Sequence, residues 1–231
     1  RRATALQSGA AEPWIRLAAL LAAAGDRRAA VETLERAEPG VPPDPVLLSD
    51  LGANYNELQR FSEAATVLRR SLRLRETADA HNNLGVTFNG LGQPADAVVE
   101  FQRALTLDAS LASSWFNLGV AQEALGQADA ARTSYTRGLD LNPRESHALF
   151  NLAMLDARAG RLTSSVQALE RAVAIDERSA ELHNELGRAY LATGRAADAR
   201  RSFERALELD PRSEAARANL ALSQSAVGTR R

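Results

Sequence analysis

The chain has 231 residues, a formal net charge of −1 and no cysteine. Disulfides, thiolate metal sites and thiol nucleophiles are therefore excluded, and a charge near zero creates no field that would draw the chain to nucleic acid or to an anionic membrane. All 28 basic residues are arginine, so the lysine of a Walker-type phosphate loop or a Schiff base is also missing. Hydrophobic residues make up 45% of the chain and aromatic residues 5%. Because the hydrophobic residues are rich in alanine and leucine, the composition favours closely packed helices over sheets.

Internal repetition with a period of 34 residues dominates the sequence. The clearest copy spans residues 112–145, and its leucine–glycine pair at Leu118 returns one period earlier at Leu84 and two periods later at Leu186. A period of this length indicates stacked helix pairs, because one pair cannot bury its apolar face without neighbours.

The chain divides into a lead-in, six repeats, a single helix and a tail. Residues 1–10 have no apolar period and are expected to be a loose lead-in, and residues 229–231 are expected to be a short tail. The repeats, each predicted to be two antiparallel helices in one array, span residues 11–44, 45–77, 78–111, 112–145, 146–179 and 180–213. Residues 214–227 repeat only the first helix and are predicted to cap the open apolar edge of the sixth repeat.

Residue types at fixed places explain how the pairs pack. Glycine or alanine at the eighth, twentieth and twenty-seventh places allows two antiparallel helices to approach closely, and a ring at the fourth, eleventh or twenty-fourth place is expected to fill the gap between pairs. The fourth repeat has Trp115, Gly119, Ala131 and Tyr135 at these places. The second repeat has Gln59 where the others have the glycine that ends the first helix.

This pattern resembles the tetratricopeptide repeat family over about residues 11–228. The match is close in the third, fourth and sixth repeats and looser in the first, second and fifth, where leucines replace rings at Leu21, Leu34, Leu68 and Leu169. The resemblance implies an all-α fold, a right-handed α-solenoid of six helix pairs with a C-terminal capping helix. It also implies a role in binding other proteins.

In this family the first helices line a concave groove, which implies that the sixth place of each repeat faces a ligand. That place holds Asn83, Asn117 and Asn151 in three consecutive repeats. Because an asparagine amide both donates and accepts, such a row could hold the backbone of an extended peptide. The row is similar to the asparagine ladder of the O-GlcNAc transferase repeats. The same asparagine also binds water or a neighbouring helix in many tetratricopeptide repeats, so both interpretations stay open.

Apolar and charged side chains beside the row complete the predicted groove. They are Phe116, Phe150, Val120, Met154, Asn82, Arg158 and Arg188. The apolar members are candidates for ligand pockets, and inter-repeat core is the alternative interpretation for the smaller ones. The mixed charge of the rim predicts a partly apolar peptide of modest charge.

We expect no catalytic residue, metal or cofactor. His81 and His183 occupy the fourth place, where other repeats have tryptophan, and are interpreted as packing residues, while His147 belongs to no recognisable triad. A row of arginines at the twenty-sixth place has acidic neighbours and is interpreted as a solvated face, not as a nucleic-acid site; its members are Arg36, Arg70, Arg103, Arg137, Arg171 and Arg205. The longest apolar run, near residues 17–24, is too short for membrane insertion.

The sequence therefore predicts a scaffold that binds an extended segment of a protein or peptide partner. One alternative is the substrate-recruiting arm of a larger transferase or hydrolase, because the chain begins at Arg1 instead of methionine. Another is self-assembly into a homo-oligomer through the terminal helices. The composition favours a bacterial source and a soluble protein, and leaves the cytoplasm and the periplasm open as its location.

Overall fold

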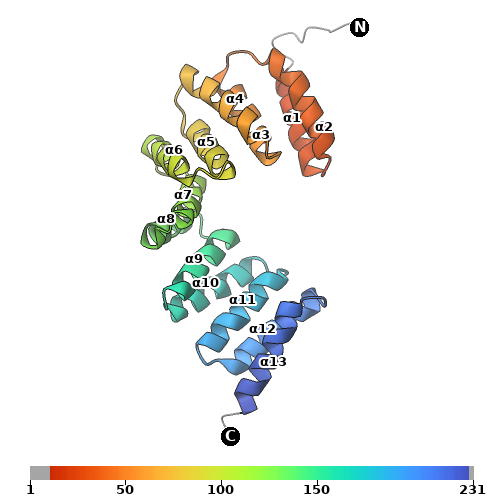
Figure 1. Ribbon diagram of the computed structural model, residues 1–231, viewed down its shortest axis with the longest axis vertical. Coiled ribbons are helices and arrows are strands. Elements are labelled where there is room, and N and C mark those ends of the chain that lie inside the picture. Colours follow the sequence, from red (N-terminus) through yellow and green to blue (C-terminus); the bar gives the residue numbers. More distant parts are fainter. Residues whose placement is uncertain (1–10, 229–231) are drawn as a thin grey trace. The chain divides into compact units, whose positions relative to one another are not determined.

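A computed structural model describes residues 11–228 (Figure 1). The predicted lead-in and tail lie outside these residues. The described chain contains α-helices and one 3₁₀ helix and no strand, which confirms the predicted all-α fold. The α-helices are α1 (Ala11–Ala23), α2 (Arg27–Ala37), α3 (Pro45–Glu57), α4 (Phe61–Leu74), α5 (Ala78–Gly90), α6 (Pro94–Leu107), α7 (Ala112–Ala124), α8 (Ala128–Leu141), α9 (Ser146–Arg158), α10 (Leu162–Ile175), α11 (Ala180–Ala192), α12 (Ala196–Leu209) and α13 (Glu214–Gly228), and the 3₁₀ helix is η1 (Glu38–Gly40). None of the helices in the described part combines the length and the apolar character that a membrane crossing requires.

The described part of the chain forms two compact units, one that ends at Ala131 and one that begins at Arg132. In the first unit α1 pairs with α2, α3 with α4 and α5 with α6, and α7 packs against α6 (Figure 1). In the second unit α9 pairs with α10 and α11 with α12, and α13 packs against α12 and α11. Each unit is thus a stack of helical hairpins, and in the first unit the successive first helices α1, α3, α5 and α7 are neighbours.

The glycine at the eighth place brings the two helices of a pair together. A Cβ added at Gly187 would lie 2.5 Å from Cε1 of Phe203, and one added at Gly85 would lie 2.5 Å from Cε1 of Phe101. Both rings are fully buried. The predicted close approach is confirmed, and the ring at the twenty-fourth place packs against the glycine of its own pair, a contact that the expectation of a filler between pairs did not include.

The turn between the two helices of a pair requires a left-handed residue. The corresponding glycines have φ between 72° and 86° and are Gly25, Gly92, Gly126, Gly160 and Gly194. Gln59 takes the same place in the α3–α4 turn with φ of 60°. This conformation costs a residue with a Cβ roughly 1 kcal/mol, so the α3–α4 turn is the strained one among these turns.

The eleventh place of the first helix is buried in most pairs but does not always hold a ring. Tyr55, Phe88 and Tyr190 fit the expectation of an aromatic filler. In α9 the place holds Asp156, a carboxylate that is only 2% exposed. Two arginines satisfy this buried charge: Nε of Arg132 and Nε of Arg161 both donate to Oδ1 of Asp156, at 2.9 and 2.6 Å.

Candidate functional site

The predicted groove residues of the first unit form hydrogen bonds between successive first helices. Nδ2 of Asn83 in α5 donates to Oγ of Ser49 in α3 at 3.3 Å. Nδ2 of Asn117 in α7 donates to Oδ1 of Asn82 in α5 at 3.2 Å, and Oγ of Ser114 donates to the same oxygen at 3.0 Å. The sixth-place amide therefore binds the fifth-place residue of the preceding repeat.

The same link recurs in the second unit, where Nδ2 of Asn219 in α13 donates to Oδ1 of Asn184 in α11 at 3.0 Å. Asn151 differs: its Nδ2 lies 3.4 Å from the hydroxyl of Tyr135 in α8. An asparagine side chain has two N–H donors and two acceptor lone pairs, so one internal bond uses only part of its capacity. Sequence reasoning treated the neighbouring helix as an alternative partner, and the structure shows that partner for Asn83 and Asn117.

The remaining predicted residues differ in exposure. In the first unit Phe116 is half-buried and Val120 is 43% exposed. In the second unit Phe150 and Met154 are half-buried, and Arg158 is exposed. Arg188 is also exposed, and its Nη1 lies 2.7 Å from Oε2 of Glu185 one turn earlier. The apolar members thus combine contact with their neighbours and some exposure to solvent.

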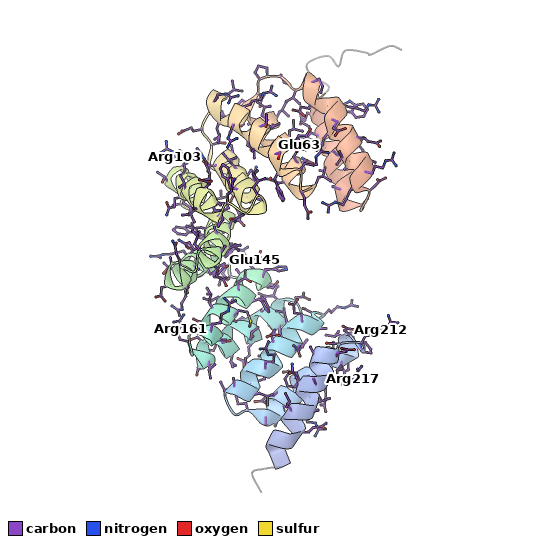
Figure 2. All side chains as sticks on the ribbon, in the orientation of Figure 1. Glu63, Arg103, Glu145, Arg161, Arg212 and Arg217 are labelled. Carbon is purple, nitrogen blue, oxygen red and sulfur yellow. The ribbon has the colours of Figure 1, made fainter. Side chains whose placement is uncertain are left out.

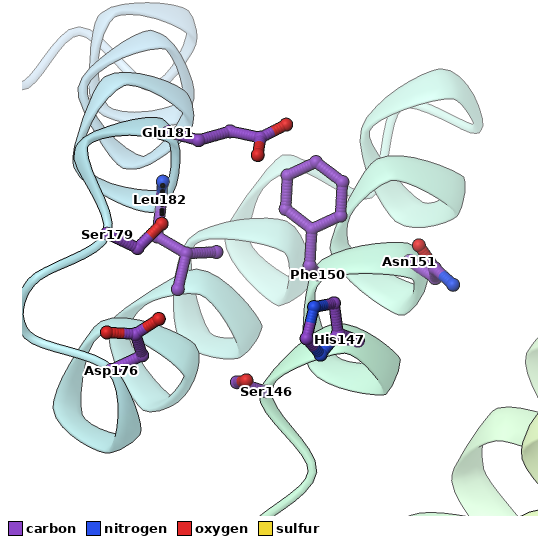
Figure 3. A pocket seen from close by; sticks show the side chains of 8 residues that line it. All are labelled: Ser146, His147, Phe150, Asn151, Asp176, Ser179, Glu181 and Leu182. Carbon is purple, nitrogen blue, oxygen red and sulfur yellow. Dashed lines mark hydrogen bonds between the residues drawn. The ribbon is translucent and has the colours of Figure 1, made fainter. Parts of the chain in front are cut away.

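Phe150 lines a pocket of about 230 Å³ between α9 and α11 (Figure 3). The other lining residues are Ser146, His147, Asn151, Asp176, Ser179, Glu181 and Leu182. The close-up shows the ring of Phe150 near the centre, with His147 beside it on α9 and Glu181 reaching toward it from α11. Asp176 lies in the turn that joins α10 to α11.

Local capping interactions fix the walls of this pocket. Ser179 is the N-cap of α11, and its Oγ accepts a hydrogen bond from the backbone N–H of Leu182 at 3.2 Å. Oδ1 of Asp176 accepts from the backbone N–H of Arg178 at 3.2 Å, which holds the turn between the helices. On the α9 side, Nδ1 of His147 lies 3.5 Å from Oε1 of Glu145, which precedes the helix.

The pocket is apolar at its centre and acidic at its edge. Phe150 and Leu182 supply the apolar surface, and the carboxylates of Asp176 and Glu181 are exposed beside it. Sequence reasoning placed Phe150 in the groove but missed Asp176. The available signal was its position in the turn between α10 and the first helix of the next repeat.

Two further cavities have a different charge. In the first unit a cavity between α4, α5 and α6 is lined by Arg69, Leu72, Arg73, Leu84, Phe88 and Glu100. In the second unit a cavity on α11 and α12 is lined by His183, Leu186, Tyr190, Arg195, Asp198, Arg201, Ser202 and Arg205. Both are therefore rich in arginine, in contrast to the pocket beside Phe150.

The two histidines at the fourth place differ in burial. His81 is 7% exposed, and its Nδ1 lies 2.6 Å from Oε2 of Glu100, which agrees with its interpretation as a packing residue. His183 is half-buried, and its Nε2 lies 3.1 Å from the carbonyl oxygen of Glu177. Across the described residues, His, Asp and Glu side chains nowhere gather in a group of three or more that could hold a metal ion.

Arginines of the twenty-sixth place interact within the protein. Arg103, labelled in Figure 2, donates from Nη2 to Oε2 of Glu76 at 2.8 Å. Nη1 of Arg205 donates to Oε2 of Glu208 at 2.8 Å, and the guanidinium of Arg36 lies 5.3 Å from the ring centroid of Trp14. Neighbouring carboxylates therefore offset part of the positive charge of this row.

Comparison with solved structures shows the same fold in other proteins. PilW, described as a widely conserved type IV pilus biogenesis factor, has a TM-score of 0.77 and 22% sequence identity, over 91% of this chain and 98% of PilW. YrrB, described as a TPR protein with an unusual peptide-binding site, has a TM-score of 0.64 and 18% identity, over 80% of this chain and 96% of YrrB. MamA has a TM-score of 0.64 and 23% identity, over 72% of this chain and 92% of MamA.

Comparison of the sequence with family models identifies the repeats directly. No curated protein matches the chain in sequence. Models described as tetratricopeptide repeat match residues 11–36, residues 50–112 and 116–180, and residues 180–213. These matches cover more than half of the chain, and they agree with the helix pairs of the structure. The chain belongs to the tetratricopeptide repeat family.

Proposed function

We propose that the protein is an interaction scaffold that binds an extended segment of a partner protein on the faces of its first helices. The observation that carries this proposal is the pocket beside Phe150, which opens between two successive first helices of the second unit. A pocket with an apolar centre and a few polar groups at its edge is the usual form of a binding site. The peptide-binding site named for YrrB, which has the same fold, supports the proposal by analogy.

The groove residues act in two ways in this proposal. Asn83 and Asn117 in the first unit, and Asn151 in the second unit, each hold the backbone of a segment bound to their own unit with the hydrogen-bonding capacity that their internal bonds do not use. Side-chain contacts come from Phe116, Phe150, Val120 and Met154, with Asn82, Arg158 and Arg188 at the rim. Because each internal bond fixes the rotamer of its asparagine, little conformational entropy is lost when a ligand binds.

A peptide-library screen tests the proposal. Wild type and the Asn117→Ala/Asn151→Ala variant are incubated with fluorescein-labelled pools of random nonapeptides, and binding is followed by fluorescence anisotropy. We expect saturable binding by wild type and a loss of about tenfold in the variant, since two backbone contacts are removed.

The control is Asn142→Ala, which removes an exposed asparagine in the turn between α8 and α9. Circular dichroism shows whether each variant keeps its helices. Unchanged binding by a folded Asn117→Ala/Asn151→Ala variant contradicts the role of the asparagine row. Absence of binding by wild type to any pool contradicts the peptide-binding function itself.

A further inference from the structure

We propose that the pocket between α9 and α11 receives an arginine side chain of the bound segment. This inference rests on the proposed function and names the ligand chemistry of one part of the groove. Its first basis is size: the pocket has about 230 Å³, which is below the several hundred Å³ of a typical small-molecule site and suits one long side chain.

Charge is the second basis. In the described part of the chain, neither carboxylate at the edge, Asp176 nor Glu181, forms an ion pair with the side chain of an arginine or a histidine, and the carboxylate of Asp176 accepts only from the backbone N–H of Arg178. Glu145 adds a third carboxylate next to the pocket, 3.5 Å from Nδ1 of His147. The pocket lining contains no arginine, although all 28 basic residues of the chain are arginine. The edge therefore carries an excess of negative charge that a cationic partner group offsets.

The apolar centre selects the shape of the cation. Phe150 presents its ring between His147 and Glu181 (Figure 3). A planar guanidinium stacks on such a face and can donate at the same time to a carboxylate beside it, which a lysine ammonium does less well. Phe150 and Leu182 also provide apolar surface for the methylene stem of an arginine.

The other cavities make the assignment specific to this place. The cavity of the first unit includes Arg69 and Arg73, and the cavity on α11 and α12 includes Arg195, Arg201 and Arg205. Arginines in the lining repel a cationic group. Of these three cavities, the pocket beside Phe150 has the charge that fits an arginine of the partner.

The experiment measures the preference for arginine and its dependence on the two carboxylates. Labelled nonapeptide pools with a fixed central arginine, lysine, citrulline or glutamate, and random residues elsewhere, are titrated with wild type and with Asp176→Asn/Glu181→Gln. We expect wild type to bind the arginine pool about tenfold more tightly than the citrulline pool, which has the same shape without the charge. In the variant this preference falls to about twofold or less.

The matched control is Asp210→Asn/Glu214→Gln. Asp210 lies in the corresponding turn one repeat later, where its Oδ1 accepts from the backbone N–H of Arg212 at 3.0 Å, and Glu214 begins the next first helix. The control makes the same change of net charge outside the pocket, so we expect it to retain the preference for arginine. A third variant, Phe150→Leu, keeps an apolar wall without the ring, and we expect the arginine and lysine pools to bind it with equal affinity.

The outcomes separate the inference from the proposed function. Binding of all pools with equal affinity by wild type overturns the arginine pocket and leaves the peptide-binding function in place. An equal loss of preference in the Asp210→Asn/Glu214→Gln control also overturns the pocket, because the effect then follows net charge. Absence of binding to every pool overturns the proposed function and the arginine pocket together.

Discussion

The hairpins α9–α10 and α11–α12 fill the same place of the repeat with opposite chemistry. At the eleventh place of the first helix, α9 has Asp156 and α11 has Tyr190, and both are buried, with 2% and 9% of their surface exposed. One hairpin thus buries a charged carboxylate where its neighbour buries a ring. The repeat tolerates either, and the reason lies in the side chains around them.

An arginine five residues after the eleventh place serves both hairpins. Nε of Arg161 donates to Oδ1 of Asp156 at 2.6 Å. In the next hairpin the guanidinium of Arg195 lies 4.2 Å from the ring centroid of Tyr190, and Nη1 of Arg195 lies 3.4 Å from Oε1 of Glu170. Oε1 of Glu170 also accepts a hydrogen bond from the hydroxyl of Tyr190 at 2.7 Å. The same arginine position neutralises a carboxylate in one case and covers a ring in the other.

The comparison implies that the two hairpins depend on different forces at this place, packing for the ring and polar contacts for the carboxylate.

The largest expected effect is that of Tyr190→Ala. It removes a buried ring and leaves a cavity, so we expect a loss of about 3 kcal/mol in the free energy of unfolding. Urea titration followed by circular dichroism measures the loss. Tyr190→Phe is the control, because it keeps the ring and removes only the hydrogen bond to Glu170, at about 1 kcal/mol. Equal losses in the two variants contradict a packing role for the ring.

Asp156→Ala is expected to have the next largest effect. The substitution removes the shared acceptor of Arg132 and Arg161, whose side chains are 42% and 35% exposed and can turn to solvent. We therefore expect a loss of about 2 kcal/mol, which is less than for a fully buried ion pair. Urea titration measures it, and hydrogen exchange of the α9 and α10 amides shows whether the loss is local.

The control for this variant is Asp156→Asn, which keeps an acceptor oxygen of similar shape without the charge. We expect it to lose less than Asp156→Ala, because one arginine can still donate to the amide oxygen. A stability of Asp156→Ala equal to that of wild type contradicts the view that the carboxylate holds this hairpin together.

Much of the fold follows from the sequence because its determinants repeat. The period of 34 residues and the eighth-place glycine depend only on spacing, which was enough to predict the close approach of the two helices at Gly187 but not that Phe203 of the same pair packs against it. Asp156 escaped this reasoning because a charged residue in an amphipathic helix is normally exposed. Its spacing of five residues to Arg161, repeated by Tyr190 and Arg195, was the available signal.

The candidate site was less predictable, because its geometry depends on neighbours that are distant in sequence. The family pattern predicts that the sixth place faces a groove, but it does not predict the bond from Asn117 to Asn82, which depends on how closely α5 and α7 approach. Phe150 could be named as an apolar candidate, whereas the acidic edge of its pocket requires the position of the α10–α11 turn. Repeat periodicity describes one hairpin well and the space between two hairpins poorly.

A smaller effect distinguishes the two arginines. Arg161→Ala leaves the buried carboxylate of Asp156 with one donor fewer, so we expect a loss of about 1.5 kcal/mol. Arg195→Ala removes exposed contacts to Glu170 and Asp198 and the stacking on the ring, for which we expect about 0.5 kcal/mol. Both are measured by urea titration under the same conditions. A larger loss for Arg195→Ala than for Arg161→Ala reverses the order that the comparison predicts.

A pH dependence in the alkaline range also separates the two hairpins. Burial, followed by the hydrogen bond to Glu170, raises the pKa of Tyr190 to about 12, from a usual value near 10. Between pH 10 and 12 the unfolded chain has lost this proton while the folded chain keeps it, so the contribution of Tyr190 to stability is complete below pH 10 and is lost as the pH rises through 12. Burial also raises the pKa of Tyr55 in the first unit, so the contribution of Tyr190 has to be isolated as a difference between two variants.

We expect the urea midpoint of wild type to fall more steeply between pH 9 and 12 than that of Tyr190→Phe. We expect Asp156→Ala to keep the slope of wild type. Parallel curves for wild type and Tyr190→Phe would mean that the hydroxyl of Tyr190 titrates equally in both states, and that the two hairpins differ at this place in packing alone.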